Sequence, residues 1–309
     1  MTEGLISAER KRFLASIIKD EVWSYAPASK DTHAKFGVDW VASNADVGNK
    51  LSIDVSNALI ETVSQSTKTP IVKRSAKMKG QTLGNKFEAS ISKFITCTFR
   101  HFSHLRPGEW SIDQITSRKE SVIGEYEQYA HLSSLGDLIE KNKDLRTFLG
   151  EGYAIAPDIV VARKPEPDEE INANLFLLDD NSVLKSKLRA RNHDAPNDPR
   201  WLLHASVSCK FTMRSDRAQN TRTEALNLIR SRKGRSPHIV AVTAEPLPSR
   251  IASLALGTGD LDCVYHFALY ELFDVLRALK KDDAIDLLRT MVDGMRLKDI
   301  SDLPLDLAV

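Results

Sequence analysis

The sequence predicts one α/β domain, spanning residues 1–309, built around a mixed β-sheet that is flanked by helices. Short apolar and β-branched runs at residues 155–162 and 238–243 are typical of buried strands. Longer segments with helical periodicity alternate with these runs, as in other α/β proteins. No internal repeat and no low-complexity linker divides the chain. We therefore expect one domain with an N-terminal helical extension and C-terminal helices.

The first third of the chain contains two predicted helices. Residues 5–24 predict the N-terminal helix, and residues 39–52, which include Asp46, form a polar segment without clear periodicity. Residues 83–102 predict a strong amphipathic helix, because aromatic and aliphatic side chains recur on one face. Glu88 lies next to that apolar stripe.

The middle of the chain predicts a strand at 110–115 and a second amphipathic helix at 120–138. The run 155–162 predicts a buried strand that the chain enters at Asp158, just after a proline. An acidic loop follows at 165–170.

Residues 202–211 alternate small or apolar residues with polar ones, which predicts a strand that ends at Lys210. Helical periodicity begins near Ser215, a plausible N-cap residue. Arginine can pair bidentately with guanine and aspartate can accept from cytosine N4, so such residues at a helix start suit a DNA major groove. A solvated helix cap is the alternative reading. Three charged residues stand at this helix start: Arg214, Asp216 and Arg217.

The last part of the chain predicts a buried strand at 238–243 and a proline-stiffened loop at 245–250 that presents Arg250. Residues 263–279 and 284–295 predict two closing helices. The first of these is apolar enough to be buried or to form a subunit contact.

Composition limits the classes of function. The chain is 42% hydrophobic and 28% charged, and its net charge of +1 argues against an indiscriminate polyanion binder. The basic stretches 68–79 and 230–235 are either exposed loops or phosphate-contacting surfaces. Without a long apolar run or a signal peptide, we expect a cytoplasmic protein. Three cysteines without close pairing predict neither a disulfide framework nor a zinc site.

The carboxylates suggest a phosphodiester hydrolase. Asp158 and Lys210 stand at two predicted strands, and Glu88 and Glu224 are helical carboxylates that could approach them. Hydrolysis of a phosphodiester uses carboxylates to hold one or two Mg²⁺ ions, and it gains from a lysine that positions water and offsets charge. This hypothesis requires the carboxyl group of Asp158 and the amine of Lys210 to lie together.

Several segments resemble one family: GQTLGNKFEA, YAIAPDIVV, SCKFTMRSDRAQN, PHIVAVTAEPLPSRI and the ending LKDISDLPLDLAV. They are similar to the NgoMIV-like type II restriction endonucleases. The similarity is strongest from Gly80 to the C-terminus and weak before it, apart from a short SNAD segment. The resemblance implies the restriction-endonuclease-like, PD-(D/E)XK fold, dependence on Mg²⁺, and a homotetramer made of two DNA-binding dimers.

The resemblance also implies roles for the acidic and basic residues. It assigns Asp158 to metal binding and makes Lys210 the catalytic lysine. Ser208 stands where many nucleases of this fold carry an acid, so a helical glutamate is expected to replace it, with Glu224 ranked slightly above Glu88. The implied catalytic set is Asp158, Lys210, Glu88, Glu224 and Ser208, and the implied metal-binding set is Asp158, Cys209, Glu88 and Glu224.

For DNA recognition, the resemblance implies that the charged cluster 214–217 reads the inner CCGG in the major groove. Arg250 matches a contact to the outer guanine, with Asp46 as its helper, and Gln81 matches a minor-groove contact. Gly48 departs from the family, because the relative has a serine there, and this leaves the outer base pair less firmly assigned.

The sequence therefore predicts a Mg²⁺-dependent type II restriction endonuclease that cuts double-stranded DNA at GCCGGC, after the first G, and leaves 5′ CCGG overhangs. Two alternatives remain. A repair nuclease on the same fold would cut without a preferred sequence, and a non-catalytic, sequence-specific DNA-binding regulator would bind DNA without cutting it.

Overall fold

The computed structural model describes residues 3–115, 123–133, 157–179, 181, 184–190, 199–213, 215–257 and 259–309. Within these ranges, every helix is too short or too polar to cross a membrane. The strands are β1 (Tyr25–Pro27), β2 (Trp40–Ala42), β3 (Trp110–Gln114), β4 (Ile159–Arg163), β5 (Leu202–Lys210), β6 (His238–Thr243), β7 (Cys263–His266) and β8 (Leu297–Asp299). The α-helices are α1 (Leu5–Lys19), α2 (Lys30–Phe36), α3 (Lys50–Thr67), α4 (Gly80–Phe99), α7 (Asp168–Ile171), α8 (Ser215–Ser231), α9 (Pro248–Ala255), α10 (Leu269–Ala278), α11 (Asp282–Asp293) and α12 (Leu303–Asp306).

Among the described residues, six strands form one mixed sheet in the order β3-β4-β5-β6-β7-β8. The pairs β3/β4 and β4/β5 are antiparallel, whereas β5, β6, β7 and β8 run parallel to one another. Parallel strands bring their carboxyl ends to one edge of a sheet. Lys210 at the end of β5 therefore pairs in register with Thr243 at the end of β6.

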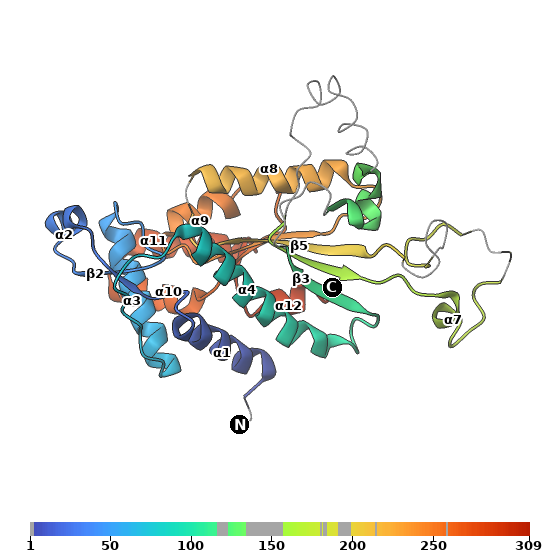
Figure 1. Ribbon diagram of the computed structural model, residues 1–309, viewed down its shortest axis with the longest axis horizontal. Helices are drawn as coiled ribbons and strands as arrows, with labels where there is room; N and C mark the ends of the chain where they lie inside the picture. The colour runs from blue at the N-terminus through green and yellow to red at the C-terminus, as the bar shows by residue number, and fades with distance from the viewer. Residues whose placement is uncertain are drawn as a thin grey trace, which may run out of the picture.

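Helices cover both faces of this sheet (Figure 1). Helix α4 packs against β3 and β5 on one face, with α1 and α12 against it. Helix α8 runs along the opposite face, beside α9, which in turn packs against β7 and α11. Because the central strands are covered on both faces, their side chains are almost entirely buried.

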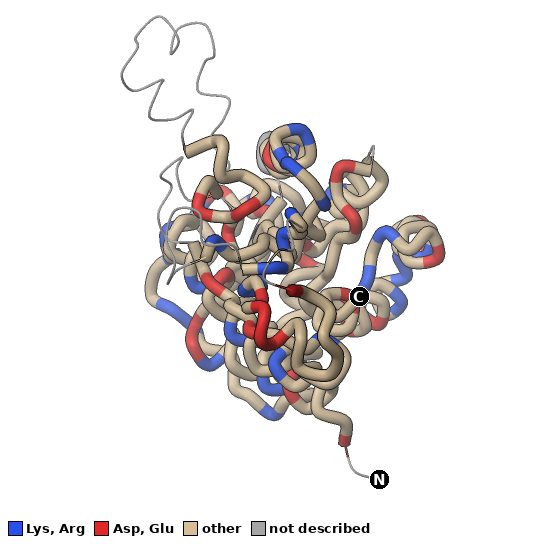
Figure 2. The backbone as a smooth tube through the Cα atoms, turned by 90° about the vertical axis from the view of Figure 1, so that its right-hand side faces the viewer, with Lys and Arg blue, Asp and Glu red and all other residues tan. Residues whose placement is uncertain are grey.

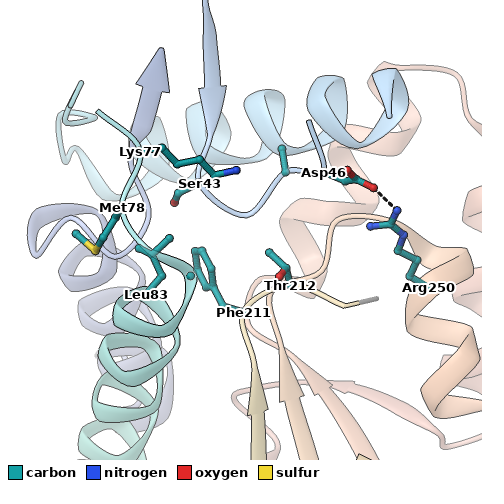
Figure 3. Close-up of a pocket in the computed structure, with 10 residues that line it drawn as sticks. Ser43, Asp46, Lys77, Met78, Leu83, Phe211, Thr212 and Arg250 are labelled. Carbon is teal, nitrogen blue, oxygen red and sulfur yellow. Dashed lines mark hydrogen bonds and ion pairs between the residues drawn. The ribbon is translucent and has the colours of Figure 1, made fainter. Parts of the chain in front are cut away.

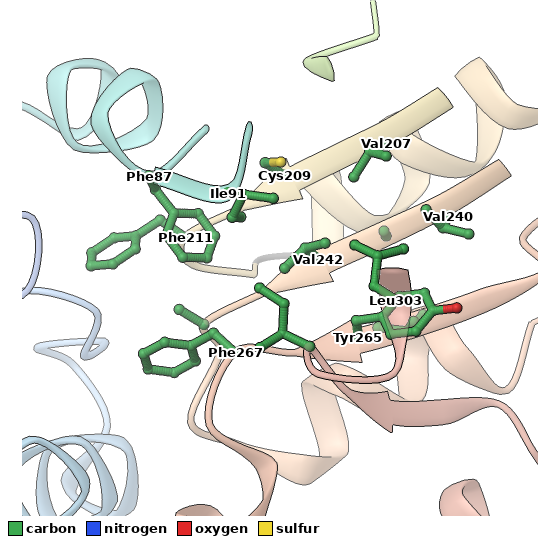
Figure 4. Packing of buried hydrophobic residues seen from close by; sticks show 14 of the residues in the cluster. Phe87, Ile91, Val207, Cys209, Phe211, Val240, Val242, Tyr265, Phe267 and Leu303 are labelled. Carbon is green, nitrogen blue, oxygen red and sulfur yellow. The ribbon is translucent and has the colours of Figure 1, made fainter. Parts of the chain in front are cut away.

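The core beneath α4 is aromatic and aliphatic (Figure 4). Phe87 of α4 meets Phe211, just beyond β5, in an edge-to-face contact with ring centroids 5.3 Å apart. Phe87 also contacts Phe267, with centroids 6.3 Å apart. Edge-to-face packing of this kind is favourable beyond the area it buries. It therefore holds the start of α4 over the carboxyl ends of the central strands.

Helix α3 was not predicted. It begins at Lys50, inside the polar segment 39–52, and continues to Thr67. The side chain of Asn49 caps the helix by accepting the backbone N–H of Ser52. Ser52 and Ser56 are fully buried on the packed face of α3. Small polar residues on a buried face hide the apolar stripe, which is why the helix could not be recognised from hydrophobic pattern alone.

Two predictions for the last third of the chain were wrong. Residues 263–279 are not one helix, since β7 precedes α10. A continuous apolar run suits a parallel strand covered on both faces as well as it suits a buried helix. Arg250 is not in a loop either, because Pro248 occupies the first turn of α9 and Arg250 lies in that turn.

Smaller differences occur elsewhere. The N-terminal helix ends at Lys19 rather than at residue 24, and the predicted acidic loop contains the one-turn helix α7. Of the predicted helix 120–138, residues 123–125 and 127–129 form the short 3-10 helices η2 (Ile123–Glu125) and η3 (Glu127–Tyr129), and residues 130–133 are α-helical. Residues 120–122 and 134–138 lie outside the described part of the chain.

Candidate active site

Asp158 and Lys210 meet at the edge of the sheet where β4 begins and β5 ends. Because β4 and β5 pair antiparallel, with Ile159 opposite Val207, the start of one strand lies beside the end of the other. The Nζ atom of Lys210 lies 3.0 Å from Oδ2 of Asp158. The contact required by the hydrolase hypothesis is therefore present.

The oxygen Oδ2 of Asp158 accepts from other donors of β5. The backbone N–H of Cys209 donates to it at 2.6 Å, and the hydroxyl of Ser208 donates at 3.4 Å. Within the described residues, the other oxygen, Oδ1, accepts no hydrogen bond from a protein group. One side of the carboxylate is thus anchored to β5 and the other side is available to a ligand.

Lys210 keeps its positive charge at this position. Burial lowers the pKa of its amine, but the charges of Asp158 and Glu224 and the hydrogen bond to Asp158 outweigh burial and raise the pKa above the ordinary value. A permanently protonated ammonium cannot take a proton from water at neutral pH. It can offset negative charge on a bound phosphate.

Glu88 and Glu224 approach the same strand end from opposite faces of the sheet. Glu88 on α4 accepts from Nε2 of Gln114, the last residue of β3, at 3.2 Å. Glu224 on α8 lines a small cavity together with Pro157 and Ser208. The charge of Glu224 acts on Lys210 and that of Glu88 acts on Cys209, so each carboxylate lies near a residue that contacts Asp158.

The thiol of Cys209 does not face this acidic group. Its side chain is 4% exposed and packs into the core near Phe87 and Ile91 (Figure 4). Burial, together with the charges of Asp158 and Glu88, raises the pKa of the thiol well above its usual value. A buried thiol that stays protonated is a poor ligand for a hard cation, and the group of Cys209 that contacts Asp158 is the backbone N–H.

The donor set at this edge consists of oxygen atoms, which suit a hard divalent cation. Mg²⁺ commonly binds through one or two carboxylates and keeps several of its waters. In the described part of the chain, no three His, Cys, Asp or Glu residues converge closely enough to form a complete metal cage. The open oxygen of Asp158, with one helical glutamate nearby, fits such a sparsely coordinated ion.

A second polar pair lies at the same end of the molecule. An ion pair joins Arg250 of α9 to Oδ2 of Asp46 (Figure 3). Two further hydrogen bonds hold Asp46 in place. Its backbone N–H donates to the hydroxyl of Ser52, and its Oδ1 accepts the N–H of Gly48 at 3.1 Å. The two residues line a cavity of about 180 Å³ that also contains Lys77 and Gly80.

The structure has space for the serine that the family resemblance implies at position 48. A Cβ atom on Gly48 would meet only Oδ1 of Asp46, at 3.5 Å, which is ordinary van der Waals contact. Gly48 is also absent from the glycines with positive φ. The glycine is therefore not required by the backbone, and a hydroxyl there would lie beside Asp46.

The remaining residues expected to contact DNA are described only in part. Gln81 is exposed in the first turn of α4, next to Gly80 of the cavity. Asp216 and Arg217 fall in the first turn of α8. Arg214 lies outside the described residues.

Sequence reasoning missed two polar residues that organise this region. Gln114 holds Glu88, and nothing in the sequence distinguishes it from other strand-end residues. Glu245 is 1% exposed and accepts two backbone N–H groups. The sequence does contain a signal for Glu245. It is the single acid in the apolar stretch HIVAVTAEPLP and directly follows a buried strand, so it must find partners in the interior.

Comparison with known proteins identifies the family of the chain. Residues 27–309 match the family described as NgoMIV restriction enzyme. The chain is also 52% identical over 269 residues to the type II restriction enzyme NgoMIV of Neisseria gonorrhoeae, an alignment that covers 87% of this chain and 90% of that protein. These matches and the mixed sheet of the described strands confirm the restriction-endonuclease-like fold. The chain therefore belongs to the NgoMIV restriction enzyme family.

Proposed function

We propose that this protein is a type II restriction endonuclease that hydrolyses double-stranded DNA at GCCGGC. Cleavage falls after the first G and leaves 5′ CCGG overhangs. The observation that carries the proposal is the contact between Lys210 and Asp158 at the ends of adjacent strands. Its support from outside the chain is the similarity to NgoMIV, which is named as a type II restriction enzyme.

The catalytic step depends on Mg²⁺ held by Asp158 and by Glu88 or Glu224. A Mg²⁺ ion held by these carboxylates would lower the pKa of a coordinated water and would stabilise the charge that develops on the phosphate oxygens. Lys210, fixed by its ion pair with Asp158, would offset the negative charge of a scissile phosphate bound at this edge of the sheet. Ser208 and the N–H of Cys209 hold the carboxylate of Asp158 so that Oδ1 stays available.

DNA recognition uses the two polar regions beside this centre. The charged residues at the start of α8 read the inner CCGG, and Arg250, oriented by Asp46, reads the outer guanine. Gln81 contacts the minor groove. Because GCCGGC is palindromic, two copies related by a two-fold axis each read one half-site, and two such dimers form a homotetramer.

The charge distribution fits site-specific binding better than binding to any polyanion. The net charge of the chain is only +1, and on the face seen in Figure 2, which carries α7, Lys and Arg are interspersed with Asp and Glu. A surface that binds DNA of any sequence requires a concentration of positive charge. In the cytoplasm, where we expect this protein to work, site-specific recognition of DNA requires only local positive groups such as Arg250.

The test is to sequence the ends that the purified protein produces from a DNA of known sequence in the presence of Mg²⁺. Cuts at G/CCGGC with 5′ CCGG ends are expected, and EDTA should abolish them. Cleavage without sequence preference would favour a repair nuclease, and tight binding to GCCGGC without cleavage would favour a non-catalytic regulator. Cleavage at CCGG with any outer base pair would support the proposed recognition of the inner four bases and would contradict the proposed recognition of the outer pair.

A further inference from the structure

Glu245 is a buried acid that the proposed chemistry does not use. It lies in the turn between β6 and α9, and its side chain is 1% exposed. A buried carboxylate is costly unless it has partners, so its contacts show what it stabilises.

Both oxygens of Glu245 hold backbone groups of recognition segments. The N–H of Met213 donates to Oε2 at 2.7 Å, and the N–H of Leu247 donates to Oε1 at 3.2 Å. Met213 directly precedes Arg214, the first residue of the cluster proposed to read the inner bases. Leu247 is the N-cap residue of α9, the helix that carries Arg250.

Arg250 joins the same arrangement through its guanidinium group. Its Nη1 lies 3.9 Å from Oε1 of Glu245 and donates to the carbonyl oxygen of Met213 at 3.3 Å. Its Nη2 pairs with Asp46. Glu245 therefore connects the segment that ends at Met213, before the inner-reading cluster, to the helix that carries Arg250. Arg250 also contacts Met213 directly.

We propose that Glu245 is a positioning residue that couples the reading of the inner and the outer base pairs, because one carboxylate fixes the backbone of both recognition segments. The proposal rests on the proposed function. It assigns Glu245 no contact with DNA or with the metal.

The charge state of Glu245 makes this coupling sensitive to pH. Burial raises the pKa of its carboxyl group to about 7, although the N–H of Met213 and the charge of Arg250 oppose the shift and Asp46 adds to it. His266, whose Nε2 lies 3.2 Å from the carbonyl oxygen of Glu245, is neutral in this range because burial lowers its pKa to about 4. Protonation converts one carboxylate oxygen into a hydroxyl, which is a donor and a weaker acceptor, so the group cannot hold both N–H groups equally well.

The experiment compares Glu245→Gln with Asp299→Asn. Asp299 is a matched control, because it is also 1% exposed and also accepts two backbone N–H groups, from Leu269 and Ser301, each at 3.0 Å. For both variants and the unchanged protein, kcat and KM are measured on duplexes that contain GCCGGC, one altered inner pair, or one altered outer pair. Thermal melts establish that each variant folds.

We expect Glu245→Gln to reduce discrimination at the inner and the outer pair together, each about 10-fold, which corresponds to about 1.4 kcal/mol. The loss should appear mainly as a higher KM on GCCGGC, since the catalytic groups stay in place. In the unchanged protein, discrimination should rise with pH through about 7, and in Glu245→Gln it should not change with pH. Asp299→Asn should lower the melting temperature and leave discrimination unaltered.

Discrimination that survives in Glu245→Gln, or that is lost at one pair alone, would overturn the coupling. If Glu245→Gln does not fold, Glu245→Asp is used, since a shorter carboxylate keeps the charge but cannot reach both N–H groups. Its discrimination is then expected to fall at both pairs. Should the unchanged protein lack sequence preference altogether, the proposed function fails, and that result is distinct from a failure of the coupling.

Discussion

Two aspartate-to-cation pairs stand at the same end of this molecule and are held in different ways. Lys210 and Asp158 have side chains that are 18% and 22% exposed, and those of Arg250 and Asp46 are 27% and 24% exposed. Burial therefore does not distinguish them. The first pair lies on neighbouring strands, whereas the second joins an N-terminal turn to α9, far along the chain.

This difference predicts different tolerance to change. The backbone ladder between β4 and β5 brings the start of β4, next to Asp158, beside the end of β5, where Lys210 lies. Asp46 and Arg250 depend on side-chain contacts with Ser52, Met213 and Glu245. Catalysis should therefore respond mainly to changes in its own residues, while recognition should also respond to changes in buried supporting groups.

The largest effect is expected from Lys210→Ala. Removing the ammonium group should lower the cleavage rate by roughly 1,000-fold, the magnitude found when a group that stabilises transition-state charge is lost. DNA binding should change little, because the recognition residues are separate. Plasmid cleavage and gel-shift assays measure the two properties. Lys298→Ala is the control, since it breaks a similar pair with Asp306 away from the site, and undiminished cutting by Lys210→Ala would refute the assignment.

The next comparison separates the two helical acids. The one that holds Mg²⁺ should lose on the order of 100-fold in activity when changed to glutamine and should need more Mg²⁺, since it supplies a metal ligand. The other should show a smaller loss and an unchanged Mg²⁺ requirement. Titrations of Glu88→Gln and Glu224→Gln decide between them. Normal Mg²⁺ dependence in both variants would mean that Asp158 binds the metal without a helical acid.

A smaller and more selective effect is expected from Asp46→Ala. Without its ion pair, Arg250 should lose about 10-fold of its preference for the outer guanine, within the range of one good base contact. The inner pairs should be read as before, in contrast to Glu245→Gln. Gly48→Ser should have the opposite effect and strengthen the preference for the outer guanine. Equal losses at the inner and outer pairs in Asp46→Ala would contradict the separation.

The smallest effect concerns stability below neutral pH. Burial lowers the pKa of His266 from 6.5 to about 4, so the unfolded chain binds a proton that the folded chain excludes. The free energy of unfolding is therefore unaffected by His266 above pH 6.5, and it decreases as the pH falls from 6.5 toward 4. Denaturant unfolding of His266→Asn should show a shallower loss over that window. The exposed His33 provides the control variant, and an unchanged slope in His266→Asn would contradict this origin.

Much of the strand end could be predicted from local pattern. Residues 238–243 form β6 as predicted, and Lys210 is the last residue of β5. A run of β-branched and apolar residues is a local property of the sequence, so a strand can be predicted from it without knowledge of the fold. The helix α3 and the strand β7 were missed, since a buried serine or a doubly covered strand changes the pattern through its neighbours. The family resemblance supplied the roles of Asp46 and Arg250, which no local pattern indicates.

The sequence by itself determined the family, the strands that carry Asp158 and Lys210, and the residue types available for metal and DNA contacts. Only the tertiary structure decided that the thiol of Cys209 enters the core and that Glu245 joins Met213 to Leu247. The physical reason is that strand alternation and helix periodicity act over a few residues. The direction of a buried side chain and the partners of a buried charge depend instead on segments that meet only when the sheet and its helices pack together.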